Sequence, residues 1–404
     1  MPVAARSSDV QPVRAAPAAE LGTPVEVGSR FHHVGALDGL RGLAFLTVLA
    51  YHLMPSRLPA AGHVGVDLFF ALSGFLITVL LRSEQARSGR VSLRRFAGRR
   101  ARRLFPALVA FLTAYLVLLA LFGRQPWFGG VPGISGAAPP LSLAAGLHSA
   151  AGAVTYMLNL GIAYHWGWAT GAPIGHLWSL SVEGQFYALW GPLVALMLSR
   201  RRLASWALPA TIALGAGSVT ATALLWHGGA GAGLVYFASF TRAQALLAGA
   251  AAGFAWRPGA FAGRRRRRAA SAVATVSAGW LAVAVFAAGR PLPTWAATVE
   301  LAMISVAAAC LVLVVASPPT GRAAGGWFLG SAALRYVGRR SYALYLWHYV
   351  VLAWFRDEGA LGSLLAVGIS FALAEASWRL VERPAARWHR GRRTAGRAPE
   401  AVRR

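Results

Sequence analysis

The sequence predicts an all-α protein, a polytopic membrane helical bundle of about ten transmembrane helices with one further re-entrant or interfacial segment. The composition is the first reason, because 56% of the 404 residues are hydrophobic and only 13% are charged. A soluble domain carries roughly 25% charged residues, so this chain has too little polar surface to cover a water-soluble fold of its size. The second reason is a series of long apolar runs, and the third is the clustering of arginines between them.

Ten apolar runs are long enough to form spanning helices, because about 20 residues of α-helix cross the hydrocarbon core. They occupy residues 35–54, 64–81, 104–123, 178–198, 204–226, 234–256, 270–288, 296–317, 339–355 and 361–381. An eleventh run at 141–164 is weaker, since it contains His148 and Asn159. Hydropathy alone does not decide whether this segment crosses the membrane.

The distribution of arginine predicts the topology. The sequence contains no lysine, so all 40 of its Lys/Arg cations are arginines, and they cluster between apolar runs, most densely in residues 82–103. Positively charged loops stay in the cytoplasm, and ten spans place all of these clusters on that side. A full crossing by residues 141–164 would turn the later clusters outward, so we expect a re-entrant or interfacial segment there. The same topology predicts a flexible cytoplasmic tail at 1–33, a membrane domain at 34–386 and a basic cytoplasmic tail at 387–404.

The net charge of +27 follows from this arrangement. Because the arginines flank apolar runs, we expect membrane lipid and not nucleic acid to be their partner. The arginine-rich loop at 93–108, LRRFAGRRARRLFPAL, has two interpretations. Its arginines can attract anionic lipid, at about 1 kcal/mol each, or their guanidinium forks can bind the phosphates of a nucleotide-bearing ligand. No histidine or cysteine cluster has the spacing of a metal site.

Several ionisable residues lie inside predicted spans, where a charge costs at least ~2.5–3.5 kcal/mol, so they are functional candidates. Arg41 and His52 are eleven residues apart, which places them on one helix face about 16 Å apart along the axis. Glu183 is expected at a depth similar to that of His52, with His176 two turns earlier on nearly the same face. A glutamate beside a histidine can orient the imidazole and raise its basicity, which suits a general base. A snorkelling arginine, an interfacial histidine and a structural ion pair are the alternatives that these residues leave open.

Several segments together resemble the membrane acyltransferase 3 family, over roughly residues 34–386. They are Arg41 and His52 within LDGLRG…YH, GVDLFFALSGFLIT around Asp67 and Ser73, an Arg-x-x-Arg pattern before LFP, WSLSVE…QFY from Trp178, SYALYLWH ending at His348, and VERP at 381–384. The Arg-x-x-Arg pattern fits Arg100 with Arg103 and also Arg99 with Arg102. One position departs from the family pattern, because a second acidic residue usually follows the glutamate and this chain has Gly184.

The resemblance implies an O-acyltransferase that moves an acetyl or other short acyl group from acyl-CoA to a sugar hydroxyl. The acceptor is expected to be a glycosylated natural product such as a macrolide, or a cell-surface polysaccharide. Acyl-CoA is expected as a co-substrate, with no tightly bound cofactor and no metal. His52, oriented by Glu183, is the expected general base, and Arg41 assists catalysis or anchors the donor together with Arg100 and Arg103. The residues expected to bind substrate are Asp67, Ser73, His176, Trp178 and His348.

The alternative from a different functional class is a proton-coupled secondary transporter, in which intramembrane arginine, histidine and glutamate form a proton relay. Transporters commonly show inverted repeats. No such symmetry is visible in this sequence, and a transporter does not need an Arg-x-x-Arg loop. Acceptor-dependent release of CoA is the measurement that distinguishes the two classes.

Overall fold

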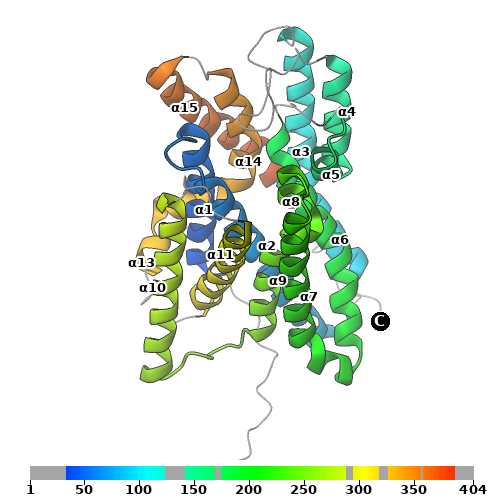
Figure 1. Ribbon diagram of the computed structural model, residues 1–404, viewed down its shortest axis with the longest axis vertical. Helices are drawn as coiled ribbons and strands as arrows, with labels where there is room; N and C mark the ends of the chain where they lie inside the picture. The colour runs from blue at the N-terminus through cyan, green and yellow to red at the C-terminus, as the bar shows by residue number, and fades with distance from the viewer. Residues whose placement is uncertain are drawn as a thin grey trace, which may run out of the picture.

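The computed structural model of the chain describes residues 33–122, 142–167, 169, 174–287, 294–317, 326–355 and 358–386. These residues form helices and turns with no β-strand among them, which confirms the all-α prediction for this part of the chain. Most of the long helices lie along the long axis of the molecule (Figure 1). The tail at 387–404 and all of the tail at 1–33 except His33 lie outside the described residues.

The helices follow one another along the chain. In order they are α1 (Gly35–Leu53), α2 (Ala61–Ser88), α3 (Leu93–Phe122), α4 (Leu143–Val154), α5 (Leu158–Ala163), η2 (Gly175–Leu177), α6 (Trp178–Ser199), α7 (Arg201–His227), α8 (Ala232–Phe237), α9 (Ser239–Ala255), α10 (Arg264–Ala287), α11 (Thr294–Val315), α13 (Gly326–Leu329), α14 (Ala332–Trp354), α15 (Gly359–Ser377) and η3 (Trp378–Glu382).

Six of the described helices are long and apolar enough to cross a membrane, namely α2, α3, α7, α10, α11 and α15. The chain is thus a multi-pass membrane protein, but the expected count of about ten spans is not confirmed. The other four predicted spans correspond to α1, α6, α9 and α14. Of these, α9 is only 17 residues long, and charged or polar side chains lower the hydropathy of the other three. The four helices contain four of the ionisable residues that the sequence singled out, Arg41, His52, Glu183 and His348, and also Arg242.

Residues 142–164 form two short helices and no continuous span. α4 has 12 residues, too few to cross the hydrocarbon core, and Tyr156 in the following turn has a left-handed backbone with φ 57°. Asn159 in α5 is fully buried, and its amide donates to the carbonyl of Phe237 at 3.0 Å and to the hydroxyl of Ser239 at 2.8 Å. These bonds hold α5 against the bundle, which favours the re-entrant form of the predicted segment over the interfacial one.

Close helix crossings bring the polar residues of the bundle together. α1 packs against α14, and α2 packs against α9, at glycines that leave no room for a side chain. A Cβ atom on Gly338 of α14 would lie 1.7 Å from the carbonyl oxygen of Asp38 in α1, and one on Gly249 of α9 would lie 2.0 Å from that of Ala71 in α2. Membrane helices use small residues in this way, because close backbone contact provides packing energy in lipid.

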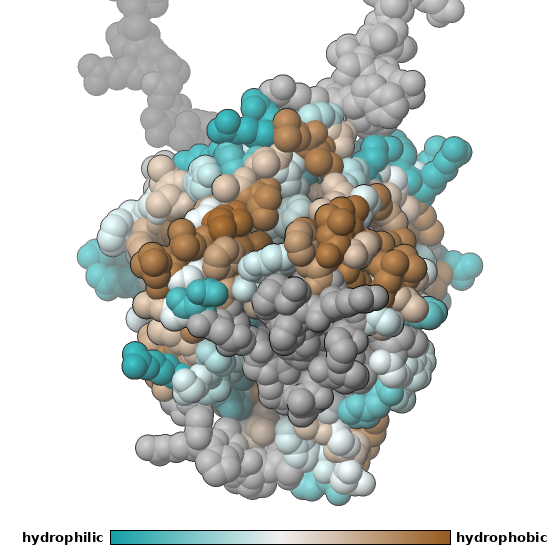
Figure 2. Space-filling model, turned by 90° about the horizontal axis from the view of Figure 1, so that it is seen from above, coloured by the Kyte–Doolittle hydropathy of each residue, from teal (hydrophilic) through white to brown (hydrophobic). Residues whose placement is uncertain are grey.

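The outer surface of the bundle is rich in apolar side chains, as a lipid-facing surface requires. Figure 2 shows such side chains gathered over part of the face at one end of the molecule. Along the helices, the most exposed large apolar residues include Leu189, Trp206, Val276, Phe286 and Leu364. Exposed apolar area of this extent in the described part of the chain is consistent with a membrane environment.

Candidate active site

Three histidines meet where the ends of α1, α14 and η2 converge. The Nδ1 atom of His52 lies 3.2 Å from the Nε2 atom of His348, and the ring centroids of His176 and His348 are 5.5 Å apart. His348 is fully buried, His176 is 6% exposed and His52 is half-buried. Tyr349 completes the cluster, with its ring 4.9 Å from those of both His52 and His176.

The hydrogen bonds of His348 determine which nitrogen of His52 is free. The Nδ1 atom of His348 lies 3.0 Å from the carbonyl oxygen of Leu344 and 2.9 Å from that of Tyr345. Carbonyl oxygens only accept, so Nδ1 of His348 carries its proton and Nε2 of the neutral ring is an acceptor. That acceptor faces Nδ1 of His52, which therefore donates. The neutral His52 ring is left with its lone pair on Nε2, the arrangement that a base needs.

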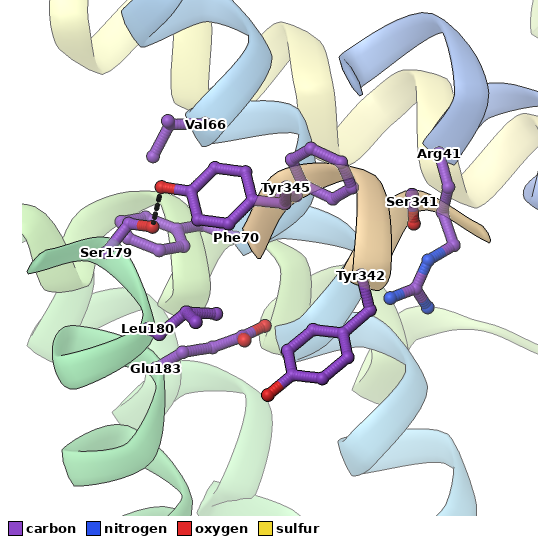
Figure 3. A pocket seen from close by; sticks show the side chains of 10 residues that line it. Arg41, Val66, Phe70, Ser179, Leu180, Glu183, Ser341, Tyr342 and Tyr345 are labelled. Atoms are coloured by element: carbon purple, nitrogen blue, oxygen red, sulfur yellow. Dashed lines mark hydrogen bonds between the residues drawn. The ribbon is translucent and has the colours of Figure 1, made fainter. Parts of the chain in front are cut away.

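A small cavity lies beside this cluster, bounded by α1, α2, α6 and α14 (Figure 3). It is lined by Arg41, Val66, Phe69, Phe70, Ser179, Leu180, Glu183, Ser341, Tyr342 and Tyr345. Its volume is about 50 Å³, enough for a few water molecules, each of which needs roughly 10–15 Å³. The space therefore matches a group of only a few heavy atoms.

The polar groups in and around the cavity come from four helices, α1, α2, α6 and α14. The hydroxyl of Ser73 donates to the carboxylate of Glu183, and Tyr187 lies beside the same carboxylate. On the opposite wall, the hydroxyl of Tyr345 lies 2.7 Å from that of Ser179 and donates to the carbonyl oxygen of His176 at 2.5 Å. The cavity thus contains a carboxylate, hydroxyls and the guanidinium of Arg41.

Arginines of α3 extend this site toward the arginine-rich end of the bundle. Arg100 lies over the ring of Tyr187, 5.1 Å from its centroid, and Arg41 is within electrostatic range of Arg100, Arg103 and Glu183. Arg99 instead donates to Glu84 at 2.9 Å. The structure thus resolves the ambiguous Arg-x-x-Arg register, because Arg100 and Arg103 are the members that approach the cavity.

The expected pairing of His52 with Glu183 is wrong. His52 bonds to His348, and Glu183 bonds to Ser73. Tyr345 contacts both parts of the site, since it lines the cavity with Glu183 and its ring is 5.6 Å from that of His348. His176, expected above Glu183 on the same face, belongs to the histidine cluster, since η2 turns its ring toward α14.

Two residues expected to bind substrate lie in a separate cluster next to the cavity. Asp67 is fully buried and forms an ion pair with Arg242, which is 1% exposed. The Arg242 guanidinium also lies over the rings of Trp178 and Tyr236, at 5.8 and 4.9 Å. Asp67 and Trp178 therefore have structural partners, and their roles in substrate binding stay predictions.

The departure from the family pattern at Gly184 has a packing reason. A Cβ atom at this position would lie 2.4 Å from the ring of Tyr156. The tyrosine that ends α4 in a left-handed turn fills the space that a second acidic side chain would need. Glu183 is accordingly the acidic residue that this helix presents to the cavity.

The sequence analysis missed the tyrosines Tyr342 and Tyr345 and the hydroxyl of Ser341, all on α14. Ser341, Tyr345 and His348 follow one another at intervals of four and three residues, which places them on one face of a helix. This spacing is visible in SYALYLWH. The polar face of α14 was therefore the signal that could have found them.

The bundle and its site define a class of protein, a multi-pass membrane protein with a histidine cluster beside a cavity that arginines approach from one end. The acyltransferase domain family matches residues 34–374. The chain belongs to this family of membrane acyltransferases, which confirms the resemblance seen in its motifs.

Individual relatives in the family are O-acetyltransferases. The chain is 28% identical over 370 residues to the peptidoglycan O-acetyltransferase OatA of Listeria monocytogenes, covering 87% of this chain and 56% of the relative. It is 30% identical over 382 residues to the putative peptidoglycan O-acetyltransferase YrhL of Bacillus subtilis, with 87% and 55% covered. The O-acetyltransferase OatA of Staphylococcus aureus is 28% identical over 375 residues, with 87% and 57% covered. The chain thus spans about half the length of these relatives, and no solved structure matches it.

Proposed function

We propose that this acyltransferase moves a short acyl group, such as acetyl, from acyl-CoA to a hydroxyl of a glycan. The observation that carries the proposal is the order of groups along the bundle: three arginines, an acyl-sized cavity with a carboxylate, and then an imidazole with a free nitrogen. Acyl-CoA acts as a co-substrate that enters from the arginine-rich end. The positive-inside bias supports a cytoplasmic location for that end and for both termini.

The donor is held at two places in this proposal. Arg100 and Arg103 bind its phosphates with their guanidinium forks, and Arg41 lines the cavity itself. The acyl thioester then occupies the cavity, where Glu183, with Ser73 and Tyr187 on its carboxylate, forms a polar wall. The small volume of the cavity supports a short acyl group and disfavours a long chain.

The chemical step takes place between the cavity and the histidine cluster. Nε2 of His52 removes the proton of the acceptor hydroxyl, and the oxygen attacks the carbonyl carbon of the thioester. The carbon–sulfur bond breaks, and the CoA thiolate leaves with the proton that the His52 imidazolium returns. General base catalysis of this kind contributes roughly 10²–10⁴-fold to the rate. His348 does not bind substrate in this scheme but holds His52 in the required tautomer.

The identity of the acceptor rests on the relatives. Two of them are named as peptidoglycan O-acetyltransferases, which supports a cell-wall glycan as acceptor. A glycosylated natural product such as a macrolide offers the same sugar hydroxyl chemistry and remains the alternative. Purified protein incubated with acetyl-CoA tests the proposal: CoA release should depend on an added glycan acceptor. A transport activity without CoA release would contradict it.

Replacing Arg100 and Arg103 by glutamine should raise the KM for acyl-CoA by about tenfold or more, since a hydrogen bond to a charged group contributes about 1.5–3 kcal/mol. The KM for the acceptor should stay the same, because both side chains lie on the donor side of the cavity. Steady-state kinetics of CoA release with each substrate varied in turn measures both constants. Arg102→Gln is the matched control, and an equal effect of that variant would contradict the assignment.

Replacing His348 by phenylalanine should lower kcat with little change in either KM. The ring of phenylalanine fills the same space, but it leaves Nδ1 of His52 without the acceptor that fixes its tautomer. His348→Gln, whose amide oxygen can accept from His52, should restore part of the rate. If glutamine and phenylalanine lower kcat equally, His348 acts by packing and not by positioning the proton.

A further inference from the structure

A second cavity lies at the arginine-rich end of the bundle and shares no residue with the site described above. It has a volume of about 560 Å³ and is formed by the ends of α2, α6, α7 and α9. One side is polar, with Arg82, Gln85, Ser205 and Arg257, and the other is apolar. None of its lining residues comes from α3, which carries Arg100 and Arg103.

The two arginines of this cavity are held together by the end of α9. Arg82 donates through Nη1 to the carbonyl oxygens of Gly253, at 2.6 Å, and Trp256, at 3.2 Å. Arg257 donates through Nη1 to the carbonyl oxygens of Phe254, at 2.6 Å, and Trp256, at 3.1 Å. Because both donate to the same oxygen of Trp256, the two guanidiniums are fixed close to each other.

Two like charges held this closely repel each other, and an anion between them lowers that repulsion. Among the described residues, the ion pairs within 4 Å use other arginines, and no carboxylate lines the cavity. The carbonyls at the end of α9 carry only about half a negative charge. In the described part of the chain, the hydrogen bonds of both guanidiniums use Nη1 alone, so Nε and Nη2 of each remain for an anion. The bonds to the carbonyls of α9 therefore use only part of the hydrogen-bond donors of Arg82 and Arg257. They leave the net positive charge of the two guanidiniums without a partner among the described residues.

The apolar side of the cavity indicates which kind of molecule the anionic group belongs to. Leu198 of α6, Leu208 of α7 and Phe254 of α9 give the cavity an apolar side next to its arginine pair. α2 and α7 are among the helices apolar enough to span the membrane, so their ends lie near the bilayer surface, where lipid phosphates are concentrated. An anion with an apolar tail fits both sides of this cavity, whereas free phosphate uses only the arginines.

We propose that this cavity binds the headgroup phosphate of an anionic phospholipid, with Arg82 and Arg257 on the phosphate and the apolar wall against the start of the lipid tails. The bound lipid supplies the missing counter-charge and joins the ends of α2, α7 and α9. This inference does not depend on the proposed function, because the cavity is separate from the acyltransferase site.

The test is a lipid titration of purified full-length protein in detergent, with native mass spectrometry to count bound phosphatidylglycerol. Saturable binding is expected, about tenfold or more weaker in the Arg82→Gln/Arg257→Gln variant, since each contact is a hydrogen bond to a charged group. Phosphatidylcholine with the same tails and inorganic phosphate should bind much more weakly. Arg265→Gln/Arg266→Gln in α10 is the matched control, because it removes the same charge from exposed arginines and should leave the affinity unchanged.

Loss of Arg82 could weaken lipid binding only because it disturbs the end of α9, so a second variant leaves both arginines in place. Ser205 is exposed on the cavity rim, and Ser205→Trp should fill the cavity while both arginines remain, again weakening phosphatidylglycerol binding about tenfold or more by the same estimate. Equal affinity of the wild type and both cavity variants would overturn the proposal, as would equal weakening by the α10 control. Inorganic phosphate that competes fully with the lipid would overturn the lipid assignment.

Discussion

Replacing His52 by alanine should reduce acyl transfer by roughly 10²–10⁴-fold, the contribution expected of a general base. His52 offers a free imidazole nitrogen with a defined tautomer, because its other nitrogen faces His348 and the buried ring of His348 is fixed by two backbone carbonyls. Acceptor-dependent release of CoA from acetyl-CoA by the purified variant measures the loss.

The control for this variant is His227→Ala, which removes an exposed histidine at the end of α7. It should keep wild-type turnover. Both variants should unfold at the wild-type temperature, because His52 is only half-buried. Wild-type turnover by His52→Ala would reject the base assignment and leave the carboxylate of Glu183 as the remaining candidate base of the cavity.

Replacing Asp67 by alanine should destabilise the protein by about 3–5 kcal/mol, because it leaves the buried Arg242 guanidinium without its carboxylate. The unpaired charge is shielded from bulk solvent, since Arg242 is 1% exposed and lies among aromatic rings. Thermal unfolding of the purified variant in detergent measures the change.

The double variant Asp67→Leu/Arg242→Met tests the cause of this effect. Replacing a buried ion pair by apolar residues is often neutral, so the double variant should be more stable than Asp67→Ala alone. If Asp67→Ala loses activity at unchanged stability, the carboxylate binds substrate, as the sequence analysis expected, and the structural interpretation is wrong.

The sequence predicted the helical membrane class and, of the residues that line the cavity, Arg41 and Glu183, but it did not predict which side chains of the site pair. Helical periodicity places Arg41 and His52 on one face of α1, yet the neighbour of that face is α14, and His52 and His348 are 296 positions apart. The rotation of one helix against another depends on how the two helices pack. In this bundle, glycines such as Gly338 set that packing by allowing close backbone contact. Helix packing also determines which Arg-x-x-Arg pair approaches the cavity. Arg99 donates to Glu84 of α2, whereas Arg100 lies over the ring of Tyr187.

The glycine crossings also restrict how this protein can move during turnover. α1 touches α14, and α2 touches α9, backbone to backbone at Gly338 and Gly249, so neither pair can slide without a steric clash. Any opening that admits a substrate must then come from elements outside these crossings, and packed helices move by small shear steps or at hinges. η2 and the start of α6 satisfy that condition and carry His176 and Glu183. We therefore expect the four crossed helices to stay fixed during turnover and any movement to occur in the segment from η2 into α6.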